Sequence, residues 1–180
     1  MYDFNLLVSC PWSAYRKAKK EILQVLGLLG DEQPFVKPTL AQGIIGVKTS
    51  LNPKQVAKEL QKLFNDGQFV FEYTLKWVPV DVWTFSEIES MKKTVAGLRD
   101  RIQLGERWRV TLEKRRYTVY HKIDIIRELA ELIDERVDLE KPDKILRVDI
   151  IGRYAGISVL SPCHVFSTTK MASIEEGRDD

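Results

Sequence analysis

Cysteine and histidine, which often serve as nucleophiles, general bases and metal ligands, are few in this chain: there are two of each. Cys163 and His164 are adjacent, and an imidazole that takes the proton of a thiol is one way to activate a cysteine nucleophile. Adjacent residues rarely bring their side chains within hydrogen-bond distance, and no third group that would orient the imidazole is evident. The pair therefore indicates an ordinary loop rather than a catalytic site.

Motifs that bind nucleotides or metals are also missing. No G-x-G-x-x-G or G-x-x-x-x-G-K-[ST] loop that would cradle a phosphate occurs, and no Asn-Pro-Pro-Tyr-like methyltransferase loop is present. Cys10 lies far from Cys163 and neither belongs to a C-x-x-C pair, which favours two free thiols over a zinc site. We therefore expect no catalytic residue, no metal and no cofactor, and we expect the chain not to be an enzyme.

Charge is distributed unevenly along the second half of the chain, although the net charge is only +2. Residues 107–127 carry seven Lys or Arg against two acids, a net charge of +5. Residues 128–143 carry seven acids against two bases, a net charge of −5. Such segregation can leave a basic face on a nearly neutral protein, and a basic face attracts phosphates.

The side chains that could bind RNA are therefore sought in and around this basic segment. Cations would bind phosphates, and tyrosine rings would offer surfaces on which unpaired bases stack. The candidates are Arg107, Arg109, Lys114, Arg115, Arg116, Tyr117, Lys122, Arg153 and Tyr154. The alternative is that these charges only solvate an exposed strand and its turns, and for Arg107 this alternative is the favoured one.

Other charged and aromatic residues have a simpler interpretation. The cluster at residues 16–20 lies on the outer face of the first predicted helix, where solvation is the default and contact with RNA or a partner the alternative. His164 and Lys170 are weaker candidates for RNA contact. Each tryptophan adjoins an apolar pattern, so Trp12, Trp77, Trp83 and Trp108 are predicted to lie in a core.

Composition is that of a globular protein, with 44% hydrophobic and 30% charged residues. No apolar run approaches the roughly 20 residues that span a bilayer, and the first residues lack the basic start and apolar stretch of a signal peptide. We expect a cytoplasmic protein with no membrane partner.

The elements of the first half alternate between strands and helices. Short apolar runs predict strands at residues 4–9 and 44–49, and residues 35–37 form a short partner for the second of them. Between these strands, apolar side chains in steps of three and four predict a helix that ends at Gly30.

A second helix and further β-structure complete this half. Asn52 followed by Pro53 is typical of a helix start, with a capping side chain before a proline at the first helical position. Alternating apolar residues at 69–82 predict a long β-rich stretch that Pro79 kinks or breaks. The order predicts an α/β (α+β) domain with a ferredoxin-like fold over residues 1–80.

The second half begins with a predicted helix. Ser86 and Glu89 have the spacing of a capping box, and an apolar stripe follows them. The alternation in residues 106–114 predicts a strand. The side chains of Trp108, Val110 and Leu112 are expected on one face, and those of Arg107 and Arg109 on the other.

The remaining elements predict a parallel pair of strands. A long helix is expected at residues 121–137, then strands at 145–152 and 156–161 that are close enough to form a hairpin. Strand, helix, strand implies a right-handed crossover. We assign residues 81–167 to a second domain and residues 168–180 to a frayed tail.

This second half resembles a THUMP domain, an RNA-binding module of tRNA-modifying and thiouridine-forming enzymes. The similarity rests on an ordered set of segments: residues 77–81, the helix from Ser86, the strand 108–115, the helix from His121, the linker 137–143 with its V-D-L-x-x-P-D pattern, and the closing strands 145–150 and 156–160. The whole chain resembles stand-alone THUMP proteins that assist tRNA cytidine acetylation.

The resemblance implies a function without catalysis by this chain. Proteins of this type bind tRNA while a separate acetyltransferase makes N4-acetylcytidine, and THUMP domains grip the acceptor stem and 3′ CCA end. The resemblance thus predicts a tRNA-binding adaptor with tRNA and an acetyltransferase as partners. The alternatives are a subunit that completes a partner's active site and an interaction module that has lost RNA binding.

Overall fold

The computed structural model describes residues 1–169, which divide into two compact units. The first unit holds Phe4–Pro79 and the segment after Pro162, and the second holds Val80–Pro162 with Met1–Asp3. The predicted second domain extends to residue 167, whereas in the structure the second unit ends at Pro162 and the residues after it pair with a strand of the first unit. The predicted tail lies, from residue 170 on, outside the described residues.

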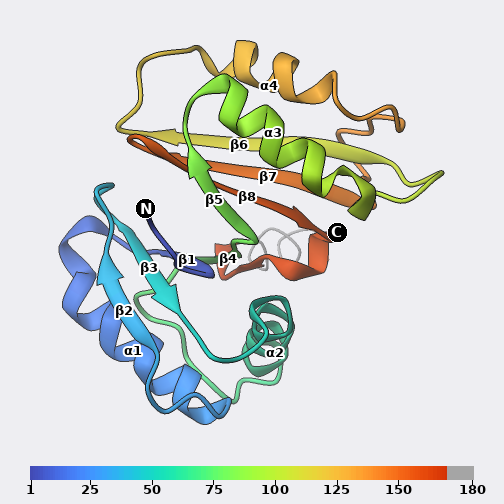
Figure 1. Ribbon diagram of the computed structural model, residues 1–180. Coiled ribbons are helices and arrows are strands. Elements are labelled where there is room, and N and C mark those ends of the chain that lie inside the picture. Colours follow the sequence, from blue (N-terminus) through green and yellow to red (C-terminus); the bar gives the residue numbers. More distant parts are fainter. Residues whose placement is uncertain (170–180) are drawn as a thin grey trace, which may run out of the picture. The chain divides into compact units, whose positions relative to one another are not determined.

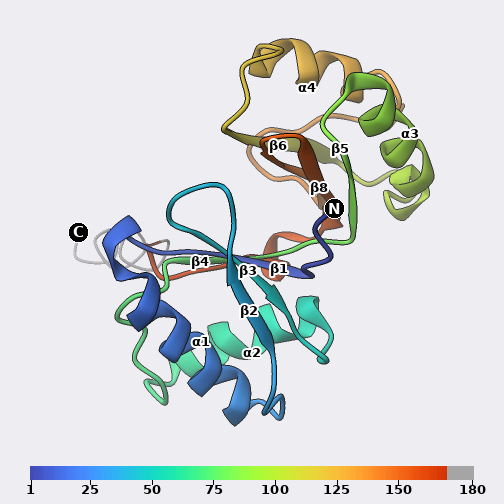
Figure 2. The same cartoon turned by 60° about the vertical axis from the view of Figure 1, so that its left-hand side comes forward.

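The first unit is an antiparallel sheet with two helices on one of its faces (Figures 1 and 2). Its elements are β1 (Leu6–Ser9), the 3₁₀ helix η1 (Trp12–Ala14), α1 (Tyr15–Leu28), β2 (Phe35–Pro38), β3 (Ile44–Lys48), α2 (Pro53–Asn65), β4 (Lys76–Pro79), the 3₁₀ helix η3 (Pro162–His164) and β9 (Phe166–Ser167). The strand order is β2-β3-β1-β4-β9. The β-α-β-β-α-β succession with this order confirms the predicted ferredoxin-like fold.

The core of the first unit lies between the sheet and its helices. The fully buried side chains include Leu6, Val8, Ile22, Leu26, Val47, Leu60, Trp77 and Phe166. The predicted helix start is confirmed, because the side chain of Asn52 accepts hydrogen bonds from the backbone N–H groups of Lys54 (3.0 Å) and Gln55 (3.2 Å). Pro53 then occupies the first helical position, where its missing N–H costs nothing.

The β-rich stretch predicted for residues 69–82 is only partly present. Residues 69–75 form a loop, and strand structure begins at Lys76. The loop is held by the buried carboxylate of Glu21, which accepts hydrogen bonds from the backbone N–H groups of Glu72 (2.6 Å) and Thr74 (2.7 Å). Backbone groups that bond to a carboxylate are not available to a strand partner, which explains why the alternating pattern does not form a strand.

The second unit is a four-stranded mixed sheet covered on one face by two helices (Figure 1). Its elements are β5 (Val82–Phe85), α3 (Ile88–Leu98), the 3₁₀ helix η2 (Arg99–Arg101), β6 (Trp108–Arg115), α4 (Lys122–Ala130), β7 (Lys144–Ile151) and β8 (Tyr154–Leu160). The strand order is β5-β8-β7-β6, with β6 and β7 parallel and the other pairs antiparallel. The predicted parallel pair and the hairpin after it are confirmed.

Two helical predictions in this unit are wrong in detail. The helix expected to reach residue 137 ends at Ala130, because the segment after it forms hydrogen bonds with Trp108 instead. The backbone N–H of Trp108 donates to the carbonyl of Arg136 (3.0 Å), and its indole N–H donates to the carbonyl of Glu135 (2.7 Å). The capping box is absent as well. The hydroxyl of Ser86 donates instead to the carbonyl of Gly152 (2.9 Å), and α3 begins at Ile88.

The core of this unit lies between the sheet and the helices α3 and α4. Its fully buried side chains include Met91, Val95, Trp108, Leu112, Ile125, Leu129, Leu146, Val148 and Ile157. Among residues 1–169, no helix is both long enough and apolar enough to cross a membrane.

Candidate nucleic-acid interface

Strand β6 separates the predicted RNA-binding residues into two groups. Arg107 and Arg109 lie at its first end, whereas Arg115 closes it and leads into the turn with Arg116 and Tyr117. A strand rises about 3.3 Å per residue, so Arg109 and Arg115 are about 20 Å apart along the strand. The nine predicted residues therefore do not form one continuous site.

At the first end of β6, Arg107 is engaged by acids of its own chain. Its guanidinium lies 3.1 Å from the carboxylate of Asp138 and 3.6 Å from that of Asp143. Its backbone N–H also donates to Asp143 (2.8 Å). These contacts satisfy the charge locally, so the structure favours a structural role for this arginine.

Arg109 holds the same segment of chain. Its Nη1 donates to the carbonyl of Leu139 (2.7 Å), and its Nε is buried without a hydrogen-bond partner among the described residues. A parallel bridge between Trp108 and Val137 aligns the segment with the strand. Together with Arg107, this arginine fastens residues 137–143 along the start of β6.

Asp138 organises the fastened segment. Its carboxylate accepts hydrogen bonds from the backbone N–H groups of Lys141 (2.9 Å) and Glu140 (3.0 Å). These bonds, and then the charge of Arg107, hold the pKa of Asp138 below its ordinary value despite the opposing effect of partial desolvation. The V-D-L-x-x-P-D pattern therefore corresponds to a turn built around this carboxylate.

At the other end of β6, two turns are tied together by hydrogen bonds. The backbone N–H of Gly152 donates to the carbonyl of Arg115 (2.9 Å), and the N–H of Ser86 donates to the carbonyl of Arg153 (2.9 Å). The hydroxyl of Tyr117 donates to the carbonyl of Ser86 (2.9 Å). The end of β6 and the β7–β8 turn are thus joined through Ser86, a residue that sequence analysis treated only as a helix cap.

A buried ion pair lies beneath this end. Arg147 donates from Nε and Nη2 to the two carboxylate oxygens of Asp149 (2.8 and 2.9 Å), and both side chains are almost fully buried. Arg115 reaches the same carboxylate at 3.4 Å. Burial alone would lower the pKa of Arg147, but the charge and hydrogen bonds of Asp149 raise it overall. The pair has no distinctive signal in the sequence and was not predicted, because alternate polar residues on a strand also occur on solvated faces.

Three cations remain exposed near this end of the sheet: Arg116, Lys122 and Arg153. None of them forms an ion pair with another residue of the described chain. Arg116 has a φ of 56°, a left-handed conformation that is uncommon outside glycine. Lys114 differs from them, because its ammonium donates to the carbonyl of Tyr120 (2.7 Å).

The predicted stacking residues are packed rather than open. Tyr117 is half-buried, and burial raises the pKa of its phenol. Tyr154 packs edge-on against Tyr2 at 5.5 Å and lies 5.8 Å from Phe85. Both rings support the turns, which leaves the exposed cations as the groups that could contact a ligand at this end.

The four tryptophans, all predicted to lie in a core, differ in burial. Trp77 and Trp108 are fully buried, as predicted. Trp83 is half-buried and packs against Tyr2 at 5.1 Å. Trp12 is 75% exposed, so its assignment to a core is wrong. It lies in η1, none of whose residues is buried.

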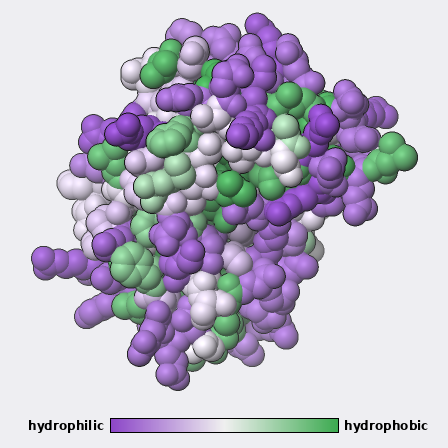
Figure 3. Space-filling model, in the orientation of Figure 1, coloured by the Kyte–Doolittle hydropathy of each residue, from purple (hydrophilic) through white to green (hydrophobic). Residues whose placement is uncertain are grey.

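The surface offers no broad apolar face on the side that Figure 3 displays. That face is mainly hydrophilic, with small and separate hydrophobic patches. Cys163 is an exposed free thiol in η3, and Cys10 is buried. Within residues 1–169, no group of three His, Cys, Asp or Glu side chains could hold a metal ion.

The sequence of the second unit matches a known family. The family model of the THUMP domain matches residues 85–160, which contain α3, β6, α4, β7 and β8. These residues therefore form a THUMP domain, an RNA-binding domain, and the resemblance predicted for this half is confirmed. No curated protein sequence matches the chain significantly.

Solved structures share the fold over most of the chain. PH1313 from Pyrococcus horikoshii Ot3 has a TM-score of 0.65 at 18% identity, over 88% of this chain and 55% of that one. A "possible methylase" from Clostridium difficile 630 has a TM-score of 0.59 at 13% identity, over 87% and 40%. A complex of a 4-thiouridine synthetase with RNA and bound ATP has a TM-score of 0.56 at 15% identity, over 92% and 42%. The chain spans about half the length of these proteins or less, and the likeness is one of fold.

Proposed function

We propose, on the premise that residues 85–160 form a THUMP domain, that this chain is a tRNA-binding adaptor. It presents tRNA, through the acceptor stem and 3′ end, to a separate modifying enzyme, for which a cytidine N4-acetyltransferase is the first candidate. The observation that carries the proposal is the group of exposed cations at one end of the THUMP sheet: Arg116, Lys122 and Arg153.

The major groove of an A-form helix is too narrow for side chains, whereas phosphates, 2′-hydroxyls and unpaired bases stay accessible. Cations on two joined turns can bind phosphates at fixed positions, since the turns cannot move apart without breaking the bonds through Ser86. The chain then recognises the shape of the RNA and its single-stranded end more than its duplex sequence.

The first test removes two of these cations. In the Arg116→Ala/Arg153→Ala variant, tRNA affinity falls several-fold, and the slope of log K against log[salt] becomes shallower by about 0.7–0.9 for each phosphate that is no longer neutralised. The matched control is Lys58→Ala/Lys62→Ala, which removes the same charge from exposed positions on α2 and leaves the slope nearly unchanged. Equal effects of the two variants would mean a generic attraction of RNA to positive charge and would refute the assigned surface.

The adaptor role is tested with defined RNAs and cofactors. Removal of the 3′ CCA weakens binding clearly, and an unrelated hairpin of equal length binds less well than tRNA at the same salt concentration. The purified chain with acetyl-CoA and ATP acetylates no tRNA by itself. Robust acetylation by the isolated chain would exclude the adaptor role.

A second candidate function is that of a subunit in another tRNA-modifying enzyme. A possible methylase and a 4-thiouridine synthetase in complex with RNA are among the structures similar to this chain, which favours this candidate. Mass spectrometry of tRNA from a deletion strain distinguishes the two, because the missing modification identifies the partner's reaction. Absence of tRNA binding in wild-type protein would favour a third role, that of an interaction module without RNA.

A further inference from the structure

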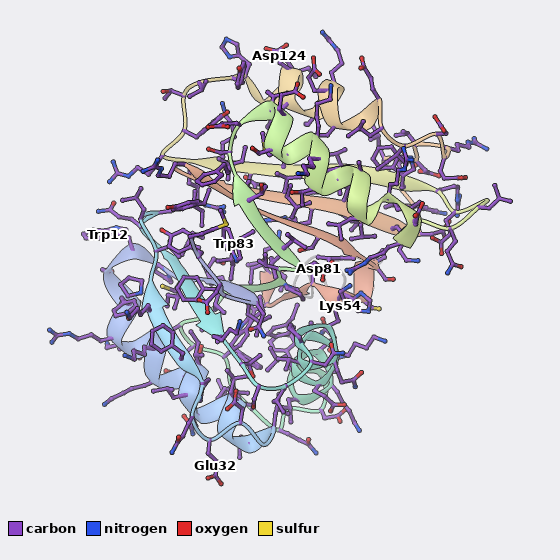
Figure 4. The ribbon with its side chains drawn as sticks, viewed as in Figure 1. Trp12, Glu32, Lys54, Asp81, Trp83 and Asp124 are labelled. Carbon is purple, nitrogen blue, oxygen red and sulfur yellow. The ribbon has the colours of Figure 1, made fainter. Side chains whose placement is uncertain are left out.

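Trp12 is the most exposed aromatic side chain of the described residues, at 75%. It lies in η1, ahead of α1, and is labelled in Figure 4. The backbone beneath it is fixed: the N–H of Cys10 donates to the carbonyl of Gly43 (2.9 Å), and the N–H of Ala14 donates to that of Pro11 (2.9 Å). Pro11 also restricts the chain immediately before the indole. The ring is thus an exposed aromatic group on a rigid support.

Gly43 explains how closely this support is packed. The residue has a φ of +78°, and a Cβ at this position would lie 2.7 Å from the carbonyl oxygen of Cys10. Only glycine allows the β2–β3 turn to approach the end of β1 so closely. The position of Trp12 is therefore set by the sheet rather than by a loop that can rearrange.

Cations follow the indole along α1. Arg16, Lys17 and Lys20 are exposed, and Lys19 is half-buried. A helix rises 1.5 Å per residue, so Arg16 and Lys20 begin about 6 and 12 Å beyond Trp12 along the axis. None of these cations forms an ion pair with a residue of the described chain.

No acid of α1 compensates this charge. Glu21 is the only acid of the helix, and it is buried with its carboxylate occupied by the loop at residues 72–74. Cations in the first half of a helix also oppose the helix dipole, so they weaken α1 rather than stabilise it. Local stability therefore does not account for the presence of Arg16 and Lys20.

A hollow of about 570 Å³ continues this surface. Lys17, Lys20, Glu21 and Gln24 of α1 form one wall. The loop after α2 forms the other, through Gln68, Phe69, Val70, Glu72 and Tyr73. The ammonium of Lys17 lies 5.3 Å from the centre of the Tyr73 ring, so a second aromatic group borders the cations. One aromatic ring, Trp12, thus precedes the cations along the chain, and another, Tyr73, borders them at the hollow.

We infer that Trp12 and the cations of α1 form a second RNA site, separate from the THUMP domain, that takes unpaired nucleotides. The indole of Trp12 stacks on one base, and Arg16 and Lys20 bind the phosphates that follow. An exposed aromatic ring followed by cations suits single strands, since every base has a face that can stack while bases in a duplex are already stacked. The inference rests on the proposed function in that the ligand is RNA.

The test uses the full chain and two RNA probes, a single-stranded uridine hexanucleotide and a blunt duplex with the same number of phosphates. Trp12→Ala weakens single-strand binding about tenfold, which corresponds to about 1.4 kcal/mol, and leaves duplex binding nearly unchanged. Trp12→Phe retains most of the affinity, because a smaller ring still stacks. Leu28→Ala, an exposed apolar residue at the far end of the same helix, is the control and changes nothing.

The cations have their own readout. In Arg16→Gln/Lys20→Gln, the salt slope for the hexanucleotide falls by about 0.7 for each phosphate that the variant no longer neutralises. Each variant is expected to fold, since the altered side chains are exposed, and thermal unfolding checks this. A slope that stays at the wild-type value would overturn the assignment of these cations to phosphates.

Each remaining outcome decides between the two proposals. Unchanged hexanucleotide affinity in Trp12→Ala overturns the second site and leaves the indole as a surface for a protein partner. Equal losses of affinity for the hexanucleotide and the duplex in Trp12→Ala overturn the assignment of the indole to base stacking. If tRNA binding responds only to Arg116 and Arg153, the second site fails and the proposed function stands. If wild-type protein binds the hexanucleotide through Trp12 but not tRNA, the proposed function fails and the second site stands.

Discussion

The two ends of β6 carry similar side chains in different surroundings. At the first end, Arg107 lies between Asp138 and Asp143, and its charge serves to fasten a segment of its own chain. At the other end, Arg116 follows the strand in a turn where no acid of the described chain pairs with it. The number of arginines is therefore a poor guide to a binding surface, and the acids that fold back onto them decide which remain available.

The acidic segment that follows α4 explains the difference. Residues 128–143 have a net charge of −5, and part of this segment runs beside the start of β6. The charge segregation seen along the sequence is thus partly cancelled in space at the first end only. The basic character that remains is concentrated at the other end, around Arg116 and Arg153.

The largest effect is expected from the buried ion pair Arg147–Asp149, which lies beneath the end of β6 that leads to Arg116. Asp149→Ala leaves the guanidinium of Arg147 buried without its partner, which lowers the free energy of unfolding by about 3–5 kcal/mol. Urea denaturation measures the loss. The double variant Arg147→Met/Asp149→Leu recovers most of it, because apolar side chains of similar size remove the uncompensated charge. A loss below about 1 kcal/mol in Asp149→Ala would show that water reaches the pair.

Smaller effects are expected from single arginine variants, and they differ between the two ends of β6. Arg107→Ala lowers the free energy of unfolding by about 0.5–1 kcal/mol, since it removes partly exposed ion pairs, and leaves the salt slope of tRNA binding unchanged. Arg116→Ala leaves stability unchanged and reduces the salt slope. Parallel denaturation and binding titrations measure both. If Arg107→Ala reduces the slope as much as Arg116→Ala, the two ends do not differ in function.

The smallest effect concerns pH. The folded pKa of Asp138 lies below its unfolded value, so this carboxylate contributes stability that is present above about pH 4 and is lost as pH falls through the folded pKa. Asp138→Asn removes that contribution. The stability difference between wild type and variant is therefore constant near neutral pH and shrinks in acid. A difference that grows as pH falls would contradict the assigned role.

Some local signals in the sequence predicted local structure, although the capping box at Ser86 and Glu89 did not form. Asn52 before Pro53 marked the start of α2, because both the cap and the proline act within a few residues. Alternation and helical periodicity predicted the ferredoxin-like fold of the first half and the parallel pair of the second, but they did not predict β5 and β9, which pair with β8 and β4. Most elements of the fold could therefore be predicted from the sequence, whereas one edge strand of each sheet could not.

Long-range contacts account for the errors. The end of α4 depends on Trp108, which lies some 20 residues earlier in the chain, and the loop after α2 depends on Glu21. The ion pair of Arg107 depends on the carboxylate of Asp138, which lies 31 positions away in the sequence. The exposure of Trp12 depends on which elements pack around η1, and none of the residues of η1 is buried. No pattern within a window of sequence reports these partners.

The strand β9 has a consequence for the order in which the chain can fold. β9 lies after the whole of the second unit in the sequence, yet it pairs with β4 and brings Phe166 into the core of the first unit. During synthesis the first unit therefore waits, with an open edge beside β4, until about 80 further residues have left the ribosome. The THUMP domain can complete its sheet in that interval. The unit that is made first is thus the one that closes last.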